Sequence, residues 1–151
     1  MGKSRATIEL IARALYARDG KLLVCRSVKG GYSYLPGGHI EFGESAAAAI
    51  ERELQEECGV AFAASICALV SENSFSTREE KHHEVNFVFH VEPKAPLVAT
   101  ISSQEPGIVF EWLDLAAVVD ADLRPESIKA WLVAGGSTDL SCGWIPMVSQ
   151  P

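Results

Sequence analysis

The amino-acid sequence predicts an α/β domain in which helices cover a mixed β-sheet. Three observations lead to this fold class: several strand-like segments of alternating apolar residues, one alanine-rich helical segment among them, and a second helical segment near the end of the chain. A length of 151 residues suits a single domain over residues 1–151. The hydrophobic fraction of 48% and the charged fraction of 22% are ordinary for a globular protein.

The N-terminal part of the chain is predicted to form a hairpin. Residues 6–17 alternate loosely between apolar and polar side chains, which indicates a strand. Asp19-Gly20 is a typical hairpin turn, and residues 21–27 are predicted as the returning strand. The glycine-rich connection at residues 29–31 then leads into a short extended piece at residues 32–35.

The central helix is predicted to run from Ser45 to Cys58. Its four consecutive alanines favour a helix, and Gly59 lies where a left-handed cap would end it. With a period of 3.6 residues, an apolar stripe suited to packing on a sheet consists of Ala47, Ile50, Leu54 and Cys58.

Three glutamates share a second face of this helix. Glu53, Glu56 and Glu57 lie at positions i, i+3 and i+4, where like charges repel by roughly 0.2–0.5 kcal/mol per pair. The helix dipole also disfavours anions in the last turn, and a pair between Arg52 and Glu56 offsets only part of this cost. A divalent cation such as Mg²⁺ would remove the repulsion, although an ordinary solvated face is the alternative for such a short pattern.

The second half of the chain is predicted to contain further strands and a last helix. The clearest strand has a core face of Val85, Phe87, Phe89 and Val91, and the opposite face is polar enough to line a pocket. The remaining expectations are a strand at residues 61–72, a polar loop at 73–81, an exposed loop at 102–107, a strand at 108–113, a helical turn at 115–119, and a helix from about Pro125 to just before Gly135. Residues 137–151 show no period and are expected either to close over the core or to contact a partner chain.

Composition excludes several classes of function. A net charge of −7 argues against general nucleic-acid binding, which needs a basic surface. The four cysteines show no paired spacing, which indicates reduced thiols. Glu9 and Arg13 interrupt the apolar residues near the N-terminus, so we expect neither a signal peptide nor a membrane span, and we expect a cytoplasmic protein. The sequence His82-His83-Glu84 lacks the second histidine of the zinc-protease pattern.

The stretch from Gly38 to Val60 resembles the signature of the Nudix hydrolases. Its matching positions are Gly38, Glu44, Arg52-Glu53-Leu54, Glu56-Glu57 and Gly59-Val60. The resemblance covers 23 of 151 residues and includes every fixed position of the motif. It implies a Nudix-type α/β/α sandwich with a mixed central sheet. It also implies Mg²⁺-dependent hydrolysis of a nucleoside diphosphate linked to another group, with Mn²⁺ as a substitute.

The resemblance also implies roles for residues of the motif. Glu53, Glu56 and Glu57 would bind one to three Mg²⁺ ions, and a backbone carbonyl of Gly37 or Gly38 would be an additional ligand. Arg52 would orient the metal-binding glutamates. Glu44 corresponds to the first glutamate of the motif, which has a weaker or outer role.

The general base of such a reaction lies outside the motif in many family members. Glu105, on the predicted loop before Trp112, is the first candidate, and Glu84 is its main rival. If neither acts, Glu56 remains. For substrate binding, Arg26 would hold a phosphate and Tyr34 or Tyr32 would stack on a base. The alternatives are a surface charge for Arg26 and structural packing for the tyrosines.

Substrate preference is indicated mainly by missing motifs. The proline that often follows the motif in ADP-ribose hydrolases is absent from residues 73–77, and the Ser-Gln-Pro-Trp type of sequence in NADH hydrolases is absent too. We therefore expect a small-molecule nucleotide, a nucleoside di- or triphosphate, with ADP-ribose or a dinucleoside polyphosphate as alternatives. A catalytically silent nucleotide-binding module would be expected to lack metal carboxylates, and an isomerase would need catalytic cysteine and histidine positions that we do not identify. A homodimer is left open.

Overall fold

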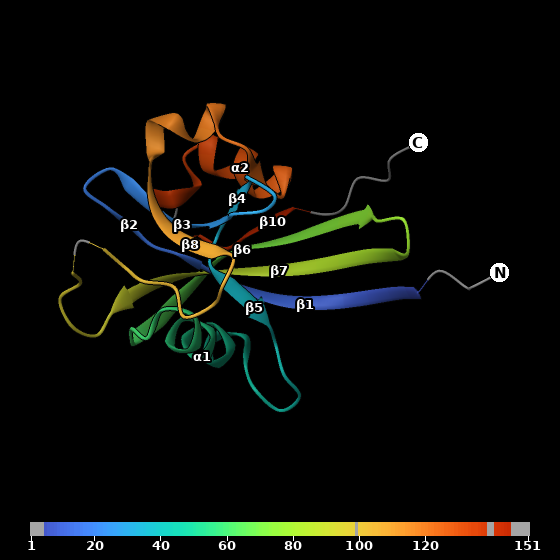
Figure 1. The fold of residues 1–151 in the computed structure, drawn as a ribbon, viewed down its shortest axis with the longest axis horizontal. Helices are drawn as coiled ribbons and strands as arrows, with labels where there is room; N and C mark the ends of the chain where they lie inside the picture. The colour runs from blue at the N-terminus through green and yellow to red at the C-terminus, as the bar shows by residue number, and fades with distance from the viewer. Residues whose placement is uncertain (1–4, 99, 139–140, 146–151) are drawn as a thin grey trace.

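The computed structural model describes residues 5–98, 100–138 and 141–145 (Figure 1). It confirms the α/β class, and the strands form two mixed sheets. The first sheet has the order β10-β6-β7-β1-β5, with bounds Gly143–Ile145, Phe62–Ser76, Glu80–Pro93, Arg5–Leu15 and Gly37–His39. In the second sheet the order is β2-β3-β4-β9, and β8 also pairs with β3; the bounds are Ala17–Arg18, Lys21–Ser27, Ser33–Tyr34, Leu123–Arg124 and Ile108–Asp114.

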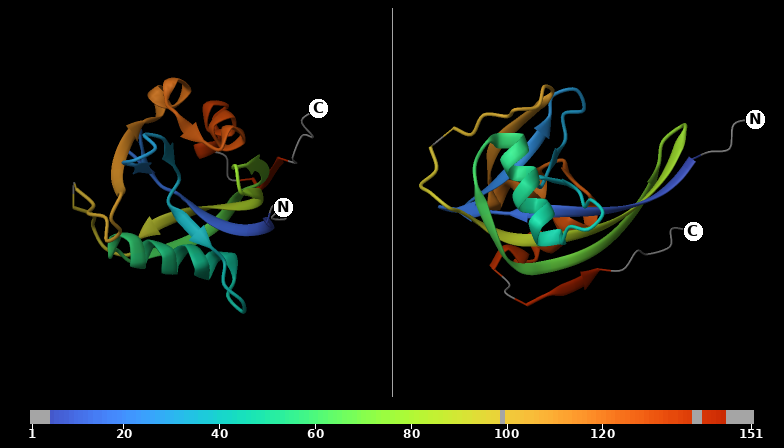
Figure 2. Two further views of the ribbon diagram at one scale, coloured as in Figure 1. Left: turned by 45° about the vertical axis from the view of Figure 1, so that its right-hand side comes forward. Right: turned by 90° about the horizontal axis from the view of Figure 1, so that it is seen from below.

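Two helices cover opposite sides of these sheets (Figure 2). Helix α1, Ala46–Cys58, packs on one side, where Ile50 and Leu54 share a core with Ala12 and Phe62. On the other side lies helix α2, Glu126–Val133, together with the 3-10 helix η1, Leu115–Asp120. Their core includes Leu15, Val88, Val118, Ile128 and Leu132. The arrangement is therefore the layered one that the resemblance implies.

The predicted turn and the predicted helix ends of the first half are confirmed, but only Ala17–Arg18 pair with the strand after the turn, because β1 belongs to the first sheet. Asp19 and Gly20 have φ angles of 53° and 72°, the positive values that a tight two-residue hairpin turn requires. In α1 the Ser45 hydroxyl accepts a hydrogen bond from the backbone N–H of Ala48, and Gly59 ends the helix with a φ of 69°. The apolar stripe is correct at Ile50, Leu54 and Cys58, whereas Ala49 is fully buried and Ala47 only partly.

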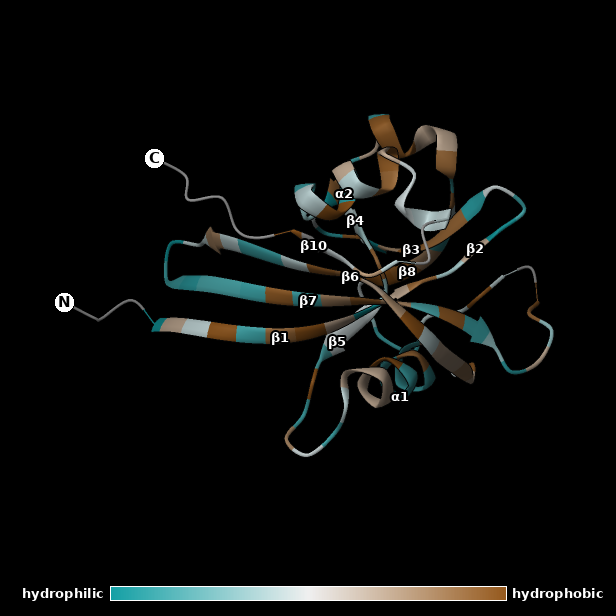
Figure 3. Cartoon of the chain, turned by 180° about the vertical axis from the view of Figure 1, so that it is seen from behind, coloured by the Kyte–Doolittle hydropathy of each residue, from teal (hydrophilic) through white to brown (hydrophobic). Residues whose placement is uncertain are grey.

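The predicted loop at residues 73–81 is wrong. Strand β6 continues to Ser76 and β7 begins at Glu80, so that only a tight turn separates them. Cross-strand pairing continues to the tip of this hairpin, where the rings of Phe75 and His82 stack with their centroids 4.7 Å apart. The segment reads as a loop because the hairpin extends beyond the helices, and polar side chains suit its exposed faces (Figure 3).

The face of β7 that was predicted to be polar and to line a pocket is largely covered by other elements. Asn86 and Val88 are fully buried, because η1 and α2 cover this side of the sheet. Phe87 and Phe89, on the predicted core face, are only partly buried. The alternation is thus present, but both of its faces are covered in the middle of the strand. Glu84, at the uncovered end, does line a pocket, as expected.

The C-terminal half otherwise follows the predicted order. The strand at 108–113, the helical turn at 115–119 and the last helix are confirmed as β8, η1 and α2. After the 3-10 helix η2, Gly136–Thr138, strand β10 pairs in parallel with β6 and is the outermost strand on that side of the first sheet. Pro146 and Met147 lie outside the described residues, as do residues 1–4. None of the helices in the described part of the chain has the length and hydrophobicity needed to cross a membrane.

Candidate active site

The guanidinium of Arg52 connects glutamates of α1 with the loop before this helix. Its Nε and Nη2 donate to the two carboxylate oxygens of Glu44, at 3.0 and 2.7 Å. Nη1 donates to Glu53 at 3.0 Å and to Glu56 at 3.2 Å, and Nη2 also reaches the carbonyl of His39 at 3.1 Å. The bonds from Arg52 lower the pKa of Glu44 to about 2, so this carboxylate is ionised. Arg52 therefore holds three carboxylates in place.

Glu57 is the carboxylate that Arg52 does not reach. Its residue is only 8% exposed, and its Oε2 is buried without a hydrogen-bond partner among the described residues. Burial, together with the nearby charges of Glu105 and Glu53, raises the pKa of Glu57 to about 8. Because a buried carboxylate without a partner is costly, Glu57 is the residue that a bound cation would relieve most.

A side chain would not fit at Gly37 or at Gly38, for two different steric reasons. A Cβ atom at Gly38 would overlap the carboxyl group of Glu53, whereas a Cβ at Gly37 would overlap the backbone carbonyl of Ala12 on β1. The absent side chain of Gly38 thus makes room for Glu53, and that of Gly37 allows β5 to pair closely with β1.

These residues fit a hard divalent cation in chemistry. The donor atoms are all oxygens, as Mg²⁺ prefers, and one of them is an orphaned buried carboxylate oxygen. No group of three or more His, Cys, Asp or Glu side chains among the described residues is already arranged to hold a metal ion. Arg52 donates hydrogen bonds to one oxygen each of Glu53 and Glu56. Binding a cation would require these carboxylates to share their oxygens between Arg52 and the metal.

A matched pair of glycine substitutions separates the two steric roles. We expect Gly38→Ala to displace the flexible carboxyl end of Glu53, which lowers the affinity for Mn²⁺ with little change in melting temperature. Gly37→Ala should lower the melting temperature, because the carbonyl of Ala12 cannot move without disturbing the sheet. Calorimetric titration with Mn²⁺ and thermal melting test both. Equal melting losses for the two variants would show that Gly38 has no role specific to Glu53.

The loop before β8 brings Glu105 to the C-terminal end of α1. The backbone N–H of Gln104 donates to the carbonyl of Glu57 at 2.6 Å, which fastens the loop to the helix. Ser103 accepts a hydrogen bond from the N–H of Glu105 and donates to its carbonyl. The Glu105 side chain is exposed, and its charge influences the pKa of Glu57. The structure therefore places this predicted residue beside the helix carboxylates.

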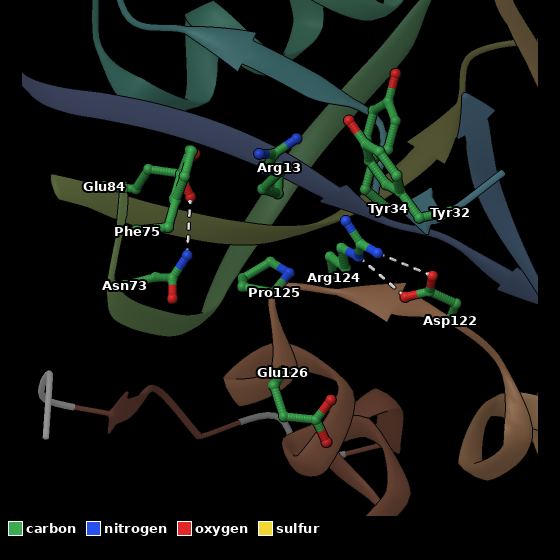
Figure 4. Close-up of a pocket in the computed structure, with 10 residues that line it drawn as sticks. All are labelled: Arg13, Tyr32, Tyr34, Asn73, Phe75, Glu84, Asp122, Arg124, Pro125 and Glu126. Carbon is green, nitrogen blue, oxygen red and sulfur yellow. Dashed lines mark hydrogen bonds and ion pairs between the residues drawn. The ribbon is translucent and has the colours of Figure 1, made fainter. Parts of the chain in front are cut away.

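A pocket of about 560 Å³ opens on the side of the sheet that carries α2 (Figure 4). Its walls are formed by Arg13, Tyr32, Tyr34, Asn73, Phe75, Glu84, Asp122, Arg124, Pro125 and Glu126. The rings of Tyr32 and Tyr34 lie side by side with centroids 6.0 Å apart. Glu84 accepts long hydrogen bonds of 3.5 Å from Asn73 and from Asn86. Of the two candidate bases, Glu84 thus belongs to the pocket, while Glu105 lies at the helix end.

Arg13 is a site residue that the sequence reasoning missed. Its Nε donates to Asn86 at 3.1 Å and its Nη1 to the carbonyl of Leu35 at 3.2 Å. Burial lowers the pKa of Arg13, although the charge of Glu84 opposes this, and no carboxylate of a described residue lies within 4.0 Å of it. The available signal was an arginine inside an otherwise apolar strand, which we used only to exclude a membrane span.

Arg124 and Asp122 were missed as well. Arg124 donates two hydrogen bonds to the carboxylate of Asp122, at 3.0 and 3.1 Å, and its guanidinium lies 4.4 Å from the ring centroid of Tyr32. This arrangement supports the tyrosine face of the pocket. The signal in the sequence was the scarcity of basic residues after residue 94, where Arg124 and Lys129 are the only two.

Arg26, the candidate for holding a phosphate, is already paired in this structure. It forms an ion pair of 2.8 Å with Glu111 on the neighbouring strand β8 and is not among the residues that line the pocket. A phosphate would therefore compete with Glu111 for the guanidinium, and the role of Arg26 stays a prediction. His82 forms a hydrogen bond of 2.8 Å with Glu9, and its ring stacks on Phe75. These two contacts fix the position of the His82 side chain.

Comparisons with known proteins address the fold and the family. The family model described as the NUDIX domain matches residues 10–132. A MutT protein from Methanosarcina mazei Go1 has a solved structure with a TM-score of 0.66 at 21% identity, covering 88% of this chain and 95% of that one. The structure of a mutator MutT protein from Bacillus halodurans has a TM-score of 0.69 at 16% identity, covering 93% of this chain and 90% of that one. The structure of an ADP-ribose pyrophosphatase from Streptococcus suis 89-1591 has a TM-score of 0.58 at 16% identity, covering 90% of this chain and 98% of that one. No curated protein matches the chain.

Proposed function

The chain belongs to the Nudix hydrolase family, and from this premise we propose that it is a pyrophosphohydrolase that cleaves a phosphoanhydride bond in a nucleoside di- or triphosphate with Mg²⁺ as cofactor. The observation that carries the proposal is the position of Glu57. A buried carboxylate with an orphaned oxygen interacts with the charges of Glu53 and Glu56 on α1, of Glu105 on the neighbouring loop, and of Arg13, which lines a pocket of suitable size.

Glu53, Glu56 and Glu57 would hold the divalent metal, together with a backbone carbonyl of Gly37 or Gly38. When bound, Mg²⁺ or Mn²⁺ supplies charge neutralisation for the phosphates and lowers the pKa of water. Arg52 keeps Glu53 and Glu56 near one another by hydrogen bonds that do not depend on the metal. This lowers the entropic cost of assembling the ligands.

Glu105 is the proposed general base, which takes a proton from the attacking water. Its exposed side chain is carried by a loop that the Gln104–Glu57 hydrogen bond anchors at the end of α1. An exposed carboxylate retains freedom to move, and it lies on the side of the helix where the metal-binding oxygens are. Glu84 is less suited to this task, because it lies in the pocket wall and is engaged by two asparagines.

The pocket is proposed to hold the nucleoside part of the substrate. Its volume falls in the usual range for small-molecule sites, and the rings of Tyr32 and Tyr34 offer a surface on which a base can stack. On the adjacent wall, Arg13 supplies hydrogen-bond donors and Glu84 supplies acceptors, with Asn86 linking the two. Such a donor and acceptor pair complements the hydrogen-bonding edge of a nucleobase.

Two other substrate classes remain as alternatives within the family. The Streptococcus suis neighbour is named an ADP-ribose pyrophosphatase, and a dinucleoside polyphosphate would present a similar base and phosphate chain. A catalytically silent nucleotide-binding module is less well supported, because all three metal-binding glutamates of the motif are present. We also propose a cytoplasmic location, which agrees with the four free cysteines.

The test is hydrolysis of a nucleotide panel by the purified protein in the presence of Mg²⁺, with products separated by ion-exchange chromatography. We expect one class of nucleoside di- or triphosphate to be turned over best, and we expect EDTA to abolish turnover and Mn²⁺ to restore it. ADP-ribose and dinucleoside polyphosphates in the same panel decide between the substrate classes. Full turnover in metal-free buffer would contradict the metal mechanism, and binding of a nucleotide without any turnover would identify a silent module.

A further inference from the structure

The first half of strand β1 has an open edge. From residues 5 to 15 the strand pairs on one side with β7, but on its other side β5 pairs only with residues 11–13, and the last bond of that side joins the N–H of Ile40 to the carbonyl of Leu10. In the part of the chain that the structure describes, no strand continues this edge alongside residues 5–9. Figure 1 shows this half of β1 extending away from both helices.

The direction of the free backbone groups follows from the hydrogen bonds of β1. The N–H of Ala14 and the carbonyl of Leu10 both bond to the segment around β5. Backbone groups of alternate residues in a strand point to the same side, so the N–H and carbonyl groups of Ala6 and Ile8 also point to the open edge. The edge thus offers two donors and two acceptors at a regular spacing.

The side chains of this edge are complementary to themselves. If a second copy of the strand pairs with it in antiparallel orientation about Thr7, Ala6 lies opposite Ile8 of the other copy, which is a hydrogen-bonded pair. Arg5 then lies opposite Glu9. Arg5 forms no ion pair with a described residue, and the Glu9 carboxylate, held at 2.8 Å by both His39 and His82, offers it a fixed negative partner. The same contact occurs twice, because the arrangement is two-fold symmetric.

Exposed apolar side chains lie along the same edge. The residue Ile8 is 77% exposed and Leu10 48%, and Phe42 on the loop between β5 and α1 is fully exposed. These three residues line a broad groove of about 700 Å³, together with Arg5, Thr7, Glu9 and Ile40. In the antiparallel pairing Ile8 lies diagonally across from its own copy on one face of the sheet, so the two side chains would cover each other.

From these observations we propose that the chain forms a symmetric homodimer through antiparallel pairing of residues 5–9 of β1, which joins the first sheets of two copies into one continuous sheet. Exposed edge strands of soluble proteins usually carry prolines, bulges or inward charges that prevent such pairing. This edge has no proline or bulge between residues 5 and 9, its charges on Arg5 and Glu9 would neutralise one another in the antiparallel pair, and it presents an exposed isoleucine. The inference is independent of the proposed catalytic activity.

Disulfide trapping tests the pairing and its register. Thr7 would face its own copy in a pair without backbone hydrogen bonds, where Cα atoms lie about 4.5 Å apart, a separation that a disulfide spans. In the full chain with Cys142→Ser, which removes the exposed native thiol, we expect Thr7→Cys to form a covalent dimer on mild oxidation. Val28→Cys, at an exposed position in the turn after β3, is the control and should stay monomeric on non-reducing gels.

Light scattering coupled to size exclusion tests the unmodified chain. We expect a mass near twice the 16.3 kDa of one chain at high protein concentration. Ile8→Lys should shift the equilibrium to the monomer, because two like charges would meet near the axis, whereas Val28→Lys, with the same change in charge and a similarly exposed side chain, should not. A monomeric wild-type protein at every concentration would overturn the proposal, as would a dimer that Ile8→Lys leaves intact or equal cross-linking of the two cysteine variants.

Discussion

We expect Glu105→Gln to lower kcat by roughly 10²–10⁴-fold, the usual scale for the loss of a general base, and to leave KM nearly unchanged. The substitution keeps the shape of the side chain but removes the group that accepts the proton. Substrate affinity should survive, because Glu105 lies at the end of α1 and does not line the pocket. Steady-state kinetics on the best substrate of the panel measures both constants.

Glu84→Gln is the matched comparison for this prediction. Glu84 lines the pocket, so its amide variant should change KM, and its relative values among different bases, more than kcat. Glu79→Gln, at an exposed position in the turn between β6 and β7, should change neither constant. A near-normal kcat for Glu105→Gln combined with a severe loss for Glu84→Gln would reverse the assignment. If both variants remain active, Glu56 is the remaining candidate for the base.

The second large effect is expected for Glu57→Gln, which should nearly abolish activity and stabilise the metal-free protein. Loss of a residue that merely supports a metal ligand costs about 10–100-fold in affinity or activity, and loss of a proposed ligand should cost at least as much. The stability gain has a separate cause. Glutamine has no charge, so the variant avoids the cost of ionising a carboxyl that is 8% exposed and has an unpaired oxygen.

The pH dependence of this stability effect follows from the pKa of Glu57. Folding raises it from 4.5 to about 8, so between these values the folded state binds more protons than the unfolded state. The wild-type, metal-free protein should therefore lose stability as the pH rises from about 4.5 to 8, by an amount on the order of a few kcal/mol. Glu57→Gln should remove this loss, and the two proteins should be equally stable at low pH.

Glu56→Gln is the control for both halves of the prediction. It removes a neighbouring carboxylate from the same helix face, but the Glu56 side chain is 59% exposed and pairs with Arg52 at the surface. We expect a loss of activity with little change in stability, since exposed ion pairs contribute little. Urea unfolding of metal-free samples across the pH range measures the difference. If Glu57→Gln is instead less stable than the wild type at pH 8, the carboxylate has a structural partner that this geometry does not reveal.

The proposed pairing lies next to the pocket wall. In the register of β1 and β7, Glu9 is opposite Glu84, which lines the pocket, whereas Glu105 is on another loop. The kinetic constants of the variants should therefore be compared at one protein concentration.

Local sequence signals determined much of the fold. The Asp19-Gly20 turn, the capped helix α1 and the order of the later elements all depend on near neighbours in the chain, and the structure agrees with them. The spacing of Glu53, Glu56 and Glu57 on one helix face is likewise a property of helical geometry, and the motif around them correctly identified the family.

Tertiary structure alone decided which of these carboxylates is buried and which distant residues join them. Glu57 is buried because the apolar side of α1 packs on the sheet, and Glu105 reaches it because a backbone hydrogen bond of Gln104 holds the loop there. Arg13 and Asn86, which are 73 positions apart in the sequence, meet across the parallel strands β1 and β7. Sequence periodicity reports which face a side chain occupies, but not what covers that face. For this reason the covered second face of β7 and the open edge of β1 became apparent only in three dimensions.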